Sequence, residues 1–117
     1  MEPRLPLKER LARQEIHRVL ASLPEDIKDE ANRCAILLAT HDVDEGLLGL
    51  FEGNAVGDGE PMSAEELPRI TLFLDTLWDE ADGDPRLFRE EVVTTLLHEL
   101  GHFLGLDEDE VEALGLG

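Results

Sequence analysis

Residues 84–105 read DPRLFREEVVTTLLHELGHFLG, and this stretch decides how the rest of the chain can fold. Asp84 before Pro85 is typical of a helix start, because aspartate accepts hydrogen bonds from the first free amides and proline suits the first helical position. Gly105 marks the end, since glycine readily adopts the left-handed conformation that terminates helices. The sequence therefore predicts a long helix from Pro85 to Leu104.

This helix is predicted to have one apolar side and one polar side. With 3.6 residues per turn, the broad apolar side collects Val92, Val93, Leu96, Leu97, Leu100, Phe103 and Leu104. The polar side collects Glu91, Thr94, Thr95, His98 and His102. The apolar side should pack against the core, so both histidines should face away from it.

The segment His98-Glu99-Leu100-Gly101-His102 lies near the end of this helix and reads H-E-x-x-H. Residues four apart lie one above the other on a helix, so the two imidazoles can aim at one point beside it. Imidazole is a common zinc ligand, and a catalytic zinc ion needs three protein ligands with one position open for water. The pattern therefore predicts a zinc ion held by both histidines and a third residue.

Acidic side chains complete the predicted site. Glu99 is not expected to be a ligand, because it lies about 100° round the helix from His98, where it can take a proton from the metal-bound water. Glu99 is therefore the candidate general base. The nearest source of a third ligand is the acidic run at residues 107–110, which follows Gly105.

Shorter helices are expected elsewhere in the chain. Apolar periodicity predicts a first amphipathic helix over residues 7–23, ended by the following proline, and a further short helix within residues 24–32. Asp75 is expected to cap another short helix that extends to Ala81. A last helical turn is expected over residues 111–114.

Three apolar runs predict strands, at residues 34–40, 47–51 and 70–74. The first run is apolar throughout, so we expect both of its faces to be buried, although its leucines and alanines would also suit a helix. The segment between the second and third strands, residues 54–66, is rich in glycine, proline and acidic residues and is expected to be a loop. Strands and helices together indicate an α+β fold.

The whole chain of 117 residues has the size of one domain, so we expect residues 1–117 to form a single domain. The formal net charge of −18 argues against binding to nucleic acid or to an anionic membrane. Cys34 is the single cysteine, which excludes an internal disulfide framework. With no signal peptide or membrane span in the sequence, a cytoplasmic location is expected.

Three stretches carry a resemblance to a known family: Leu47 to Gly53, Leu67 to Phe73, and Glu90 to Leu114. Together they resemble the small bacterial zincin-like metallopeptidases, a minimal metalloprotease fold. The resemblance implies a small mixed sheet packed against an N-terminal helix and a long active-site helix, one zinc ion, and hydrolysis of peptide bonds. It also implies a strand at the sheet edge above the site that pairs with an extended substrate, here Ile70 to Phe73.

The resemblance also bears on the third zinc ligand. Family members carry an aspartate at the end of the pattern H-E-x-x-H-x-x-G-x-x-D, where this chain has Glu108 and, one position earlier, Asp107. Glu108 is the predicted ligand by position, and Asp107 is the alternative by residue type. The sequence has no tyrosine, so a phenolic donor to the oxyanion is missing, and His41 and Arg69 are the candidates for that role.

The function predicted from these residues is that of a zinc metallopeptidase. A zinc-activated water would attack a peptide bond of a peptide or protein substrate, with Glu99 as the general base. The alternative is a non-catalytic protein of the same fold that binds metal, a peptide or a protein partner, because one fold supports many functions. The missing oxyanion donor and a chain too short for deep substrate pockets are the reasons to keep this alternative.

Overall fold

The computed structural model describes residues 5–40, 46–53 and 68–113, and within these ranges it leaves aside the side chains of Leu5, Glu108 and Val111. In chain order the elements are α1 (Leu5–Ser22), α2 (Glu25–Ala31), β1 (Ala35–Ala39), β2 (Gly49–Glu52), β3 (Arg69–Phe73), α3 (Leu74–Glu80), α4 (Pro85–Leu104) and α5 (Glu108–Ala113). The predicted α+β class is confirmed. The predicted loop over residues 54–66 lies outside the described residues.

The three described strands form one mixed sheet in the order β1-β3-β2. β1 runs parallel to β3, and β2 runs antiparallel to it. β3 is therefore the central strand, and the expectation that Ile70 to Phe73 forms a sheet edge is wrong. The hydrophobic pattern of a strand indicates which residues are buried, but its place in the sheet depends on which other segments pair with it.

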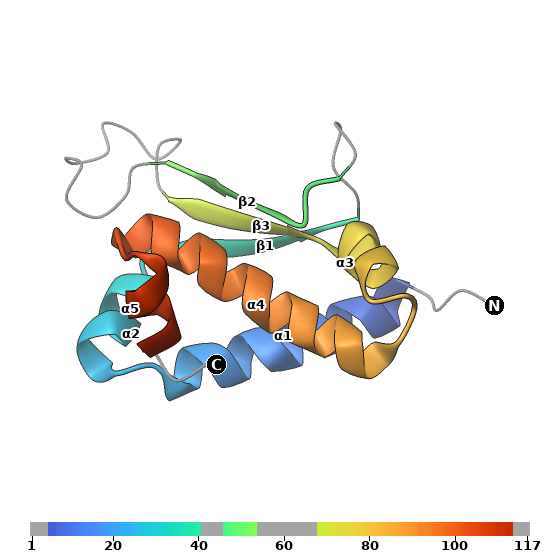
Figure 1. Cartoon of the computed structure of the whole chain (residues 1–117), viewed down its shortest axis with the longest axis horizontal. Coiled ribbons are helices and arrows are strands. Elements are labelled where there is room, and N and C mark those ends of the chain that lie inside the picture. Colours follow the sequence, from blue (N-terminus) through green and yellow to red (C-terminus); the bar gives the residue numbers. More distant parts are fainter. Residues whose placement is uncertain (1–4, 41–45, 54–67, 114–117) are drawn as a thin grey trace.

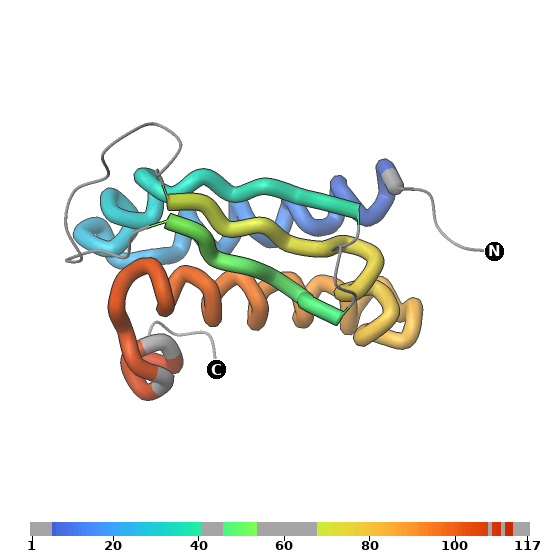
Figure 2. Tube along the Cα trace, turned by 90° about the horizontal axis from the view of Figure 1, so that it is seen from above, coloured from blue at the N-terminus to red at the C-terminus, as the bar shows by residue number. Residues whose placement is uncertain are grey.

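The sheet forms one layer, and α1 and α4 form a second layer against one of its faces (Figure 1). α4 packs against α1, α3, β2 and β3. Figure 2 shows α4 running alongside β2, whereas α1 lies toward the β1 side. The core between the layers contains the most deeply buried large side chains, which are Val19, Ile70, Leu72, Leu74, Leu77, Phe88, Val92, Leu96 and Leu100.

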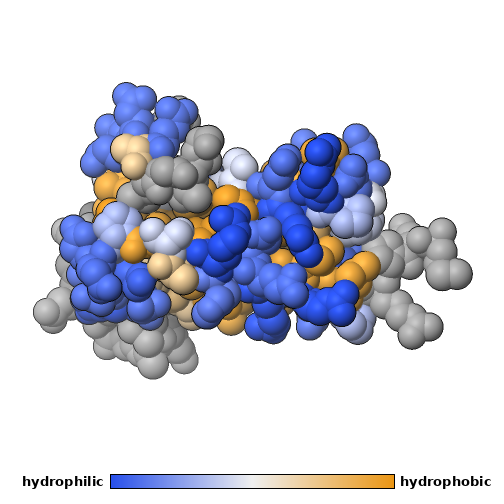
Figure 3. Space-filling model, turned by 90° about the horizontal axis from the view of Figure 1, so that it is seen from below, coloured by the Kyte–Doolittle hydropathy of each residue, from blue (hydrophilic) through white to orange (hydrophobic). Residues whose placement is uncertain are grey.

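The helix layer presents a largely polar surface to solvent. Figure 3 shows the molecule from the helix side, where hydrophilic side chains cover most of the surface and hydrophobic ones show between them. This is the surface expected when amphipathic helices bury their apolar sides against a sheet. None of the described helices combines the length and the apolar character that a membrane span requires.

β1 is less buried than its sequence predicted. Ile36 and Leu38 pack against the core, whereas Leu37 is 48% exposed on the opposite face. In the sheet register Leu37 lies beside Thr71, and Thr71 lies beside Leu50, which is also exposed. The expectation of two buried faces is wrong, because the helices cover one face of the sheet and no described element covers the other.

α4 begins and ends at the residues that the sequence predicted. The Asp84 carboxylate accepts a hydrogen bond from the N–H of Arg86 at 2.8 Å. At the other end Gly105 has a φ of 72°, and the N–H of Leu106 donates to the carbonyl of Gly101 at 2.9 Å. This is the hydrogen-bond pattern of a Schellman motif. Local hydrogen bonds thus fix both ends of the helix that carries the H-E-x-x-H motif.

α3 begins without the predicted aspartate cap. β3 continues directly into α3, so Phe73 occupies the capping position, and no side chain caps the helix. Asp75 lies in the first turn, where its N–H donates to the carbonyl of Thr40 at 2.8 Å. Its carboxylate accepts a hydrogen bond from the ammonium group of the buried Lys8 at 2.9 Å. The same ammonium group lies 5.6 Å from the centroid of the Trp78 ring. Asp75 therefore links α3 to α1 and to the end of β1.

Candidate metal centre

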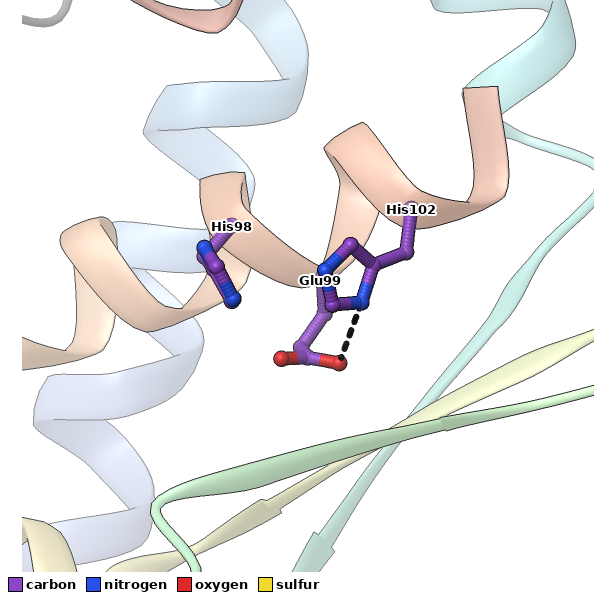
Figure 4. A group of neighbouring side chains, drawn as sticks. All are labelled: His98, Glu99 and His102. Atoms are coloured by element: carbon purple, nitrogen blue, oxygen red, sulfur yellow. Dashed lines mark ion pairs between the residues drawn. The ribbon is translucent and has the colours of Figure 1, made fainter. Parts of the chain in front are cut away.

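Two imidazoles and one carboxylate come together on α4. His98, Glu99 and His102 can each offer one ligand atom, and these atoms all lie within 4.8 Å of one another. The centroids of the two imidazole rings are 4.5 Å apart, with an angle of 64° between the ring planes. Figure 4 shows the three side chains projecting from α4 into the same space, on the side toward β2. The structure thus brings together three of the residues that the sequence predicted for the site.

The three side chains differ in their exposure to solvent. Both imidazoles are exposed, the side chain of His102 to 54%, whereas the side chain of Glu99 is 10% exposed. Glu99 Oε1 lies 3.4 Å from His102 Nδ1. The imidazoles are therefore accessible to a ligand from solvent, whereas the Glu99 side chain is largely buried.

The chemistry of these donors fits a divalent metal ion. Zinc binds imidazole nitrogens at about 2.0–2.1 Å, and it accepts a mixture of nitrogen and carboxylate ligands. Donor atoms already within 4.8 Å of one another need only small side-chain rotations to reach one ion. His98 and His102 are the residues that could hold it, and their exposure leaves space for a further ligand.

Asp107 has a different role in the described structure. Its carboxylate accepts from the N–H of Glu110 at 2.8 Å, and the Glu110 carboxylate accepts from the N–H of Asp107 at 3.2 Å. This reciprocal pair is a capping box at the start of α5. Asp107 is not part of the group that contains the histidines. The Glu108 side chain lies outside the described residues, so its assignment as third ligand stays a prediction.

Of the two proposed oxyanion donors, the structure describes only Arg69. Arg69 pairs with Glu52 across the neighbouring strands β3 and β2, with 3.3 Å between Nη2 and Oε2. His41 lies outside the described residues. The structure therefore gives Arg69 a partner in the sheet.

Sequence reasoning missed two residues that shape the site. Gly49 of β2 lies so close to α4 that a Cβ there would be 2.7 Å from Thr95 Cγ2. Thr95 is 7% exposed, although the helical wheel placed it on the solvent-facing side, because β2 covers this strip of α4. A glycine inside a strand often marks a close approach of another element, so the signal was present in residues 47–51.

Residues 22–117, the larger part of the chain, match the zincin-like metallopeptidase family. The chain belongs to this family. The resemblance seen in the sequence is thereby confirmed, and α4 is the zincin-like helix that carries the H-E-x-x-H motif. The predicted small mixed sheet, with an N-terminal helix and a long helix packed together beneath it, is present as well. No curated protein matches the chain.

Proposed function

We propose that this zincin-like protein is a zinc-dependent metallopeptidase that hydrolyses peptide bonds. The observation that carries the proposal is the group of His98, Glu99 and His102 on α4, with ligand atoms within 4.8 Å, in a chain of this family. His98 and His102 would hold the zinc ion together with Glu108, or with Asp107 as the alternative. When bound, a zinc ion would act as a Lewis acid, which makes water more acidic and polarises a carbonyl group.

Glu99 would move the proton in this reaction. As general base it takes a proton from the attacking water, and it later passes that proton to the leaving amine. Its position supports the role, because the carboxylate lies 3.4 Å from His102 and therefore beside the expected ligands. Its burial supports the role as well. A side chain packed between helix and strand is already held in one orientation, so little conformational freedom has to be lost when it reacts.

We place the peptide substrate along β2 instead of β3. β2 is an edge of the described sheet and packs on α4, so its outer side can pair with an extended chain by β-augmentation. The stem of Glu99 lies close to Gly49 in this strand. A peptide paired with β2 would therefore pass beside the proposed general base.

Two further parts of the proposal rest on the sequence. With a net charge of −18, we expect neutral or basic peptides to be cleaved in preference to acidic ones. A cytoplasmic location also stays part of the proposal, and the single cysteine agrees with it because it gives no sign of an oxidising compartment.

The test is to measure the zinc content of the purified protein and then to digest a mixed peptide library with it. We expect close to one zinc ion per chain together with cleavage, and both should be lost in His98→Ala and His102→Ala. Full zinc occupancy in either histidine variant would contradict the proposed metal site. A subset of library peptides matched in length and differing in charge tests the expected preference.

The second candidate is a non-catalytic zincin-like protein that binds metal and a peptide or protein partner. The observations that favour it are the absence of tyrosine from the sequence and the pairing of Arg69 with Glu52, which together leave the oxyanion without a described donor. Near-stoichiometric zinc without cleavage of any library peptide would favour this candidate.

A further inference from the structure

β2 approaches α4 closely at Gly49. A Cβ on Gly49 would lie 2.7 Å from Thr95 Cγ2, 3.3 Å from Leu72 Cδ2 and 3.4 Å from Glu99 Cγ. Carbon atoms in contact are normally about 3.5–4.0 Å apart, so at the first of these contacts either the Thr95 side chain or the strand would have to shift. Space is the reason for glycine here, because Gly49 is not among the described glycines with positive φ, which are Gly46, Gly53, Gly83 and Gly105.

The contact falls on the strip of α4 that carries the proposed general base. Thr95 and Glu99 are four residues apart, so their side chains adjoin on the helix, and they are 7% and 8% exposed. Leu72 of β3 lies directly beside Gly49 in the sheet register, and its side chain packs against the same place. The strand thus packs on the stem of Glu99, and the carboxylate extends beyond this contact to 3.4 Å from His102.

We propose that Gly49 is a positioning residue for the peptidase reaction: the missing side chain lets β2 hold the stem of Glu99 in place and keeps its carboxylate beside the two histidines. This inference rests on the proposed function. Gly49 acts through Glu99, since a Cβ at position 49 would meet side-chain atoms of Thr95, Leu72 and Glu99. A side chain at position 49 moves β2 away from α4 and frees the Glu99 stem, so turnover should suffer more than substrate binding.

The experiment compares Gly49→Ala alone with two double variants. Thr95→Ala removes the Cγ2 atom that the new methyl group would meet, together with the hydroxyl group, so Gly49→Ala with Thr95→Ala gains a methyl group on the strand and loses one on the helix. Thr95→Val keeps a methyl group in that place and replaces the hydroxyl group by a second methyl group of similar size, so Gly49→Ala with Thr95→Val is the matched control. Each zinc-loaded protein is assayed for kcat and KM well below its unfolding temperature, beside wild type and the single Thr95 variants.

We expect kcat to fall on the order of tenfold in Gly49→Ala and in the Thr95→Val double variant, with KM within about twofold of wild type. In the Thr95→Ala double variant kcat should return to within about twofold of wild type, because contacting residues are not additive. Zinc affinity should stay the same throughout, since none of the three atoms nearest to a Cβ at position 49 belongs to a histidine.

Several outcomes would overturn the inference. An unfolding temperature that falls while kcat stays at the wild-type value would make Gly49 a packing residue only. Failure of Thr95→Ala to restore kcat would show that the contact with Thr95 is not the cause. Where Gly49→Ala does not fold, Thr95→Leu places a larger side chain against Gly49 from the helix side, and an unchanged kcat in that variant would count against the inference. A zinc-loaded wild type without hydrolysis defeats the proposed function and this inference together, whereas an active wild type with unaffected variants defeats this inference alone.

Discussion

The two long sides of α4 make different contributions to the protein. On the core side, Leu96 and Leu100 are at most 1% exposed and pack between the sheet and α1. On the other side, His98 and His102 are exposed, and Glu99 is the buried member of their group. The residues that hold the helix in the core carry no reactive group, and of the three reactive residues only Glu99 is buried. Stability and reactivity should therefore be separable by mutation.

The largest effect is expected for Glu99→Gln on the site side. Glutamine keeps the shape of the side chain but cannot accept the proton, so kcat should fall by about 10²–10⁴-fold. The unfolding temperature and the zinc content should change little, because Glu99 is neither a predicted ligand nor part of the apolar core. Peptide hydrolysis, calorimetry and elemental analysis of the same preparation measure the three quantities.

Loss of zinc from Glu99→Gln would give the opposite assignment. The Glu99 carboxylate lies within the same 4.8 Å group as the imidazoles, so distance alone would also allow it to be a ligand. A variant without metal would therefore identify Glu99 as a ligand instead of the base.

Leu96→Ala tests the core side of the same helix. Leu96 is fully buried, so its truncation should lower the free energy of unfolding by about 2–5 kcal/mol. Leu37→Ala is the matched control, because Leu37 is 48% exposed on the outer face of β1 and should cost less than about 1 kcal/mol. Urea unfolding measures both changes. A large fall in kcat for the folded fraction of Leu96→Ala would show that the two sides of α4 are not separable.

The third prediction concerns the acidic residues that follow α4. Glu108→Ala should weaken zinc binding by at least about tenfold, because loss of a ligand should exceed the effect of losing an outer-shell partner. Asp107→Ala should leave zinc affinity nearly unchanged, and it should destabilise α5 by about 0.5–2 kcal/mol through loss of the capping box. Zinc titration against a competing chelator separates the two residues. A larger loss of affinity in Asp107→Ala would make Asp107 the ligand and would require the capping box to open.

The comparison also shows which features a sequence can predict. The first and last residues of α4 could be predicted because its ends depend on local signals, the cap Asp84 and the terminating Gly105. The burial of Thr95 could not, because it depends on β2, a strand more than forty positions away that packs across it. The central place of β3 has the same origin, since strand order arises from pairing between distant segments.

The candidate site shows the same division. The spacing of His98, Glu99 and His102 lies within little more than one helical turn, so helix geometry alone brings them together. Asp107 was harder to interpret, because its short segment contains two overlapping patterns, the register of a third metal ligand and the D-x-x-E spacing of a capping box. Local sequence indicates both roles for Asp107, and the described hydrogen bonds are those of the cap.

The smallest effect is expected at Cys34. This residue tests whether solvent is excluded from the core, in contrast to the exposed histidines of the site. Cys34 is 6% exposed, and burial raises the pKa of its thiol from 9.0 to about 11. The thiolate is the reactive form, so a disulfide reagent at pH 8 should react slowly with the native protein and rapidly in urea.

The pKa of Cys34 in the folded protein is above its pKa in the unfolded chain, so the thiol of the unfolded chain ionises first as the pH rises. The stability contributed by Cys34 is therefore full below pH 9 and is lost as the pH rises toward 11. Between pH 8 and pH 10 the wild type should lose slightly more stability than Cys34→Ala, and equal losses together with rapid native labelling would show that solvent reaches this part of the core.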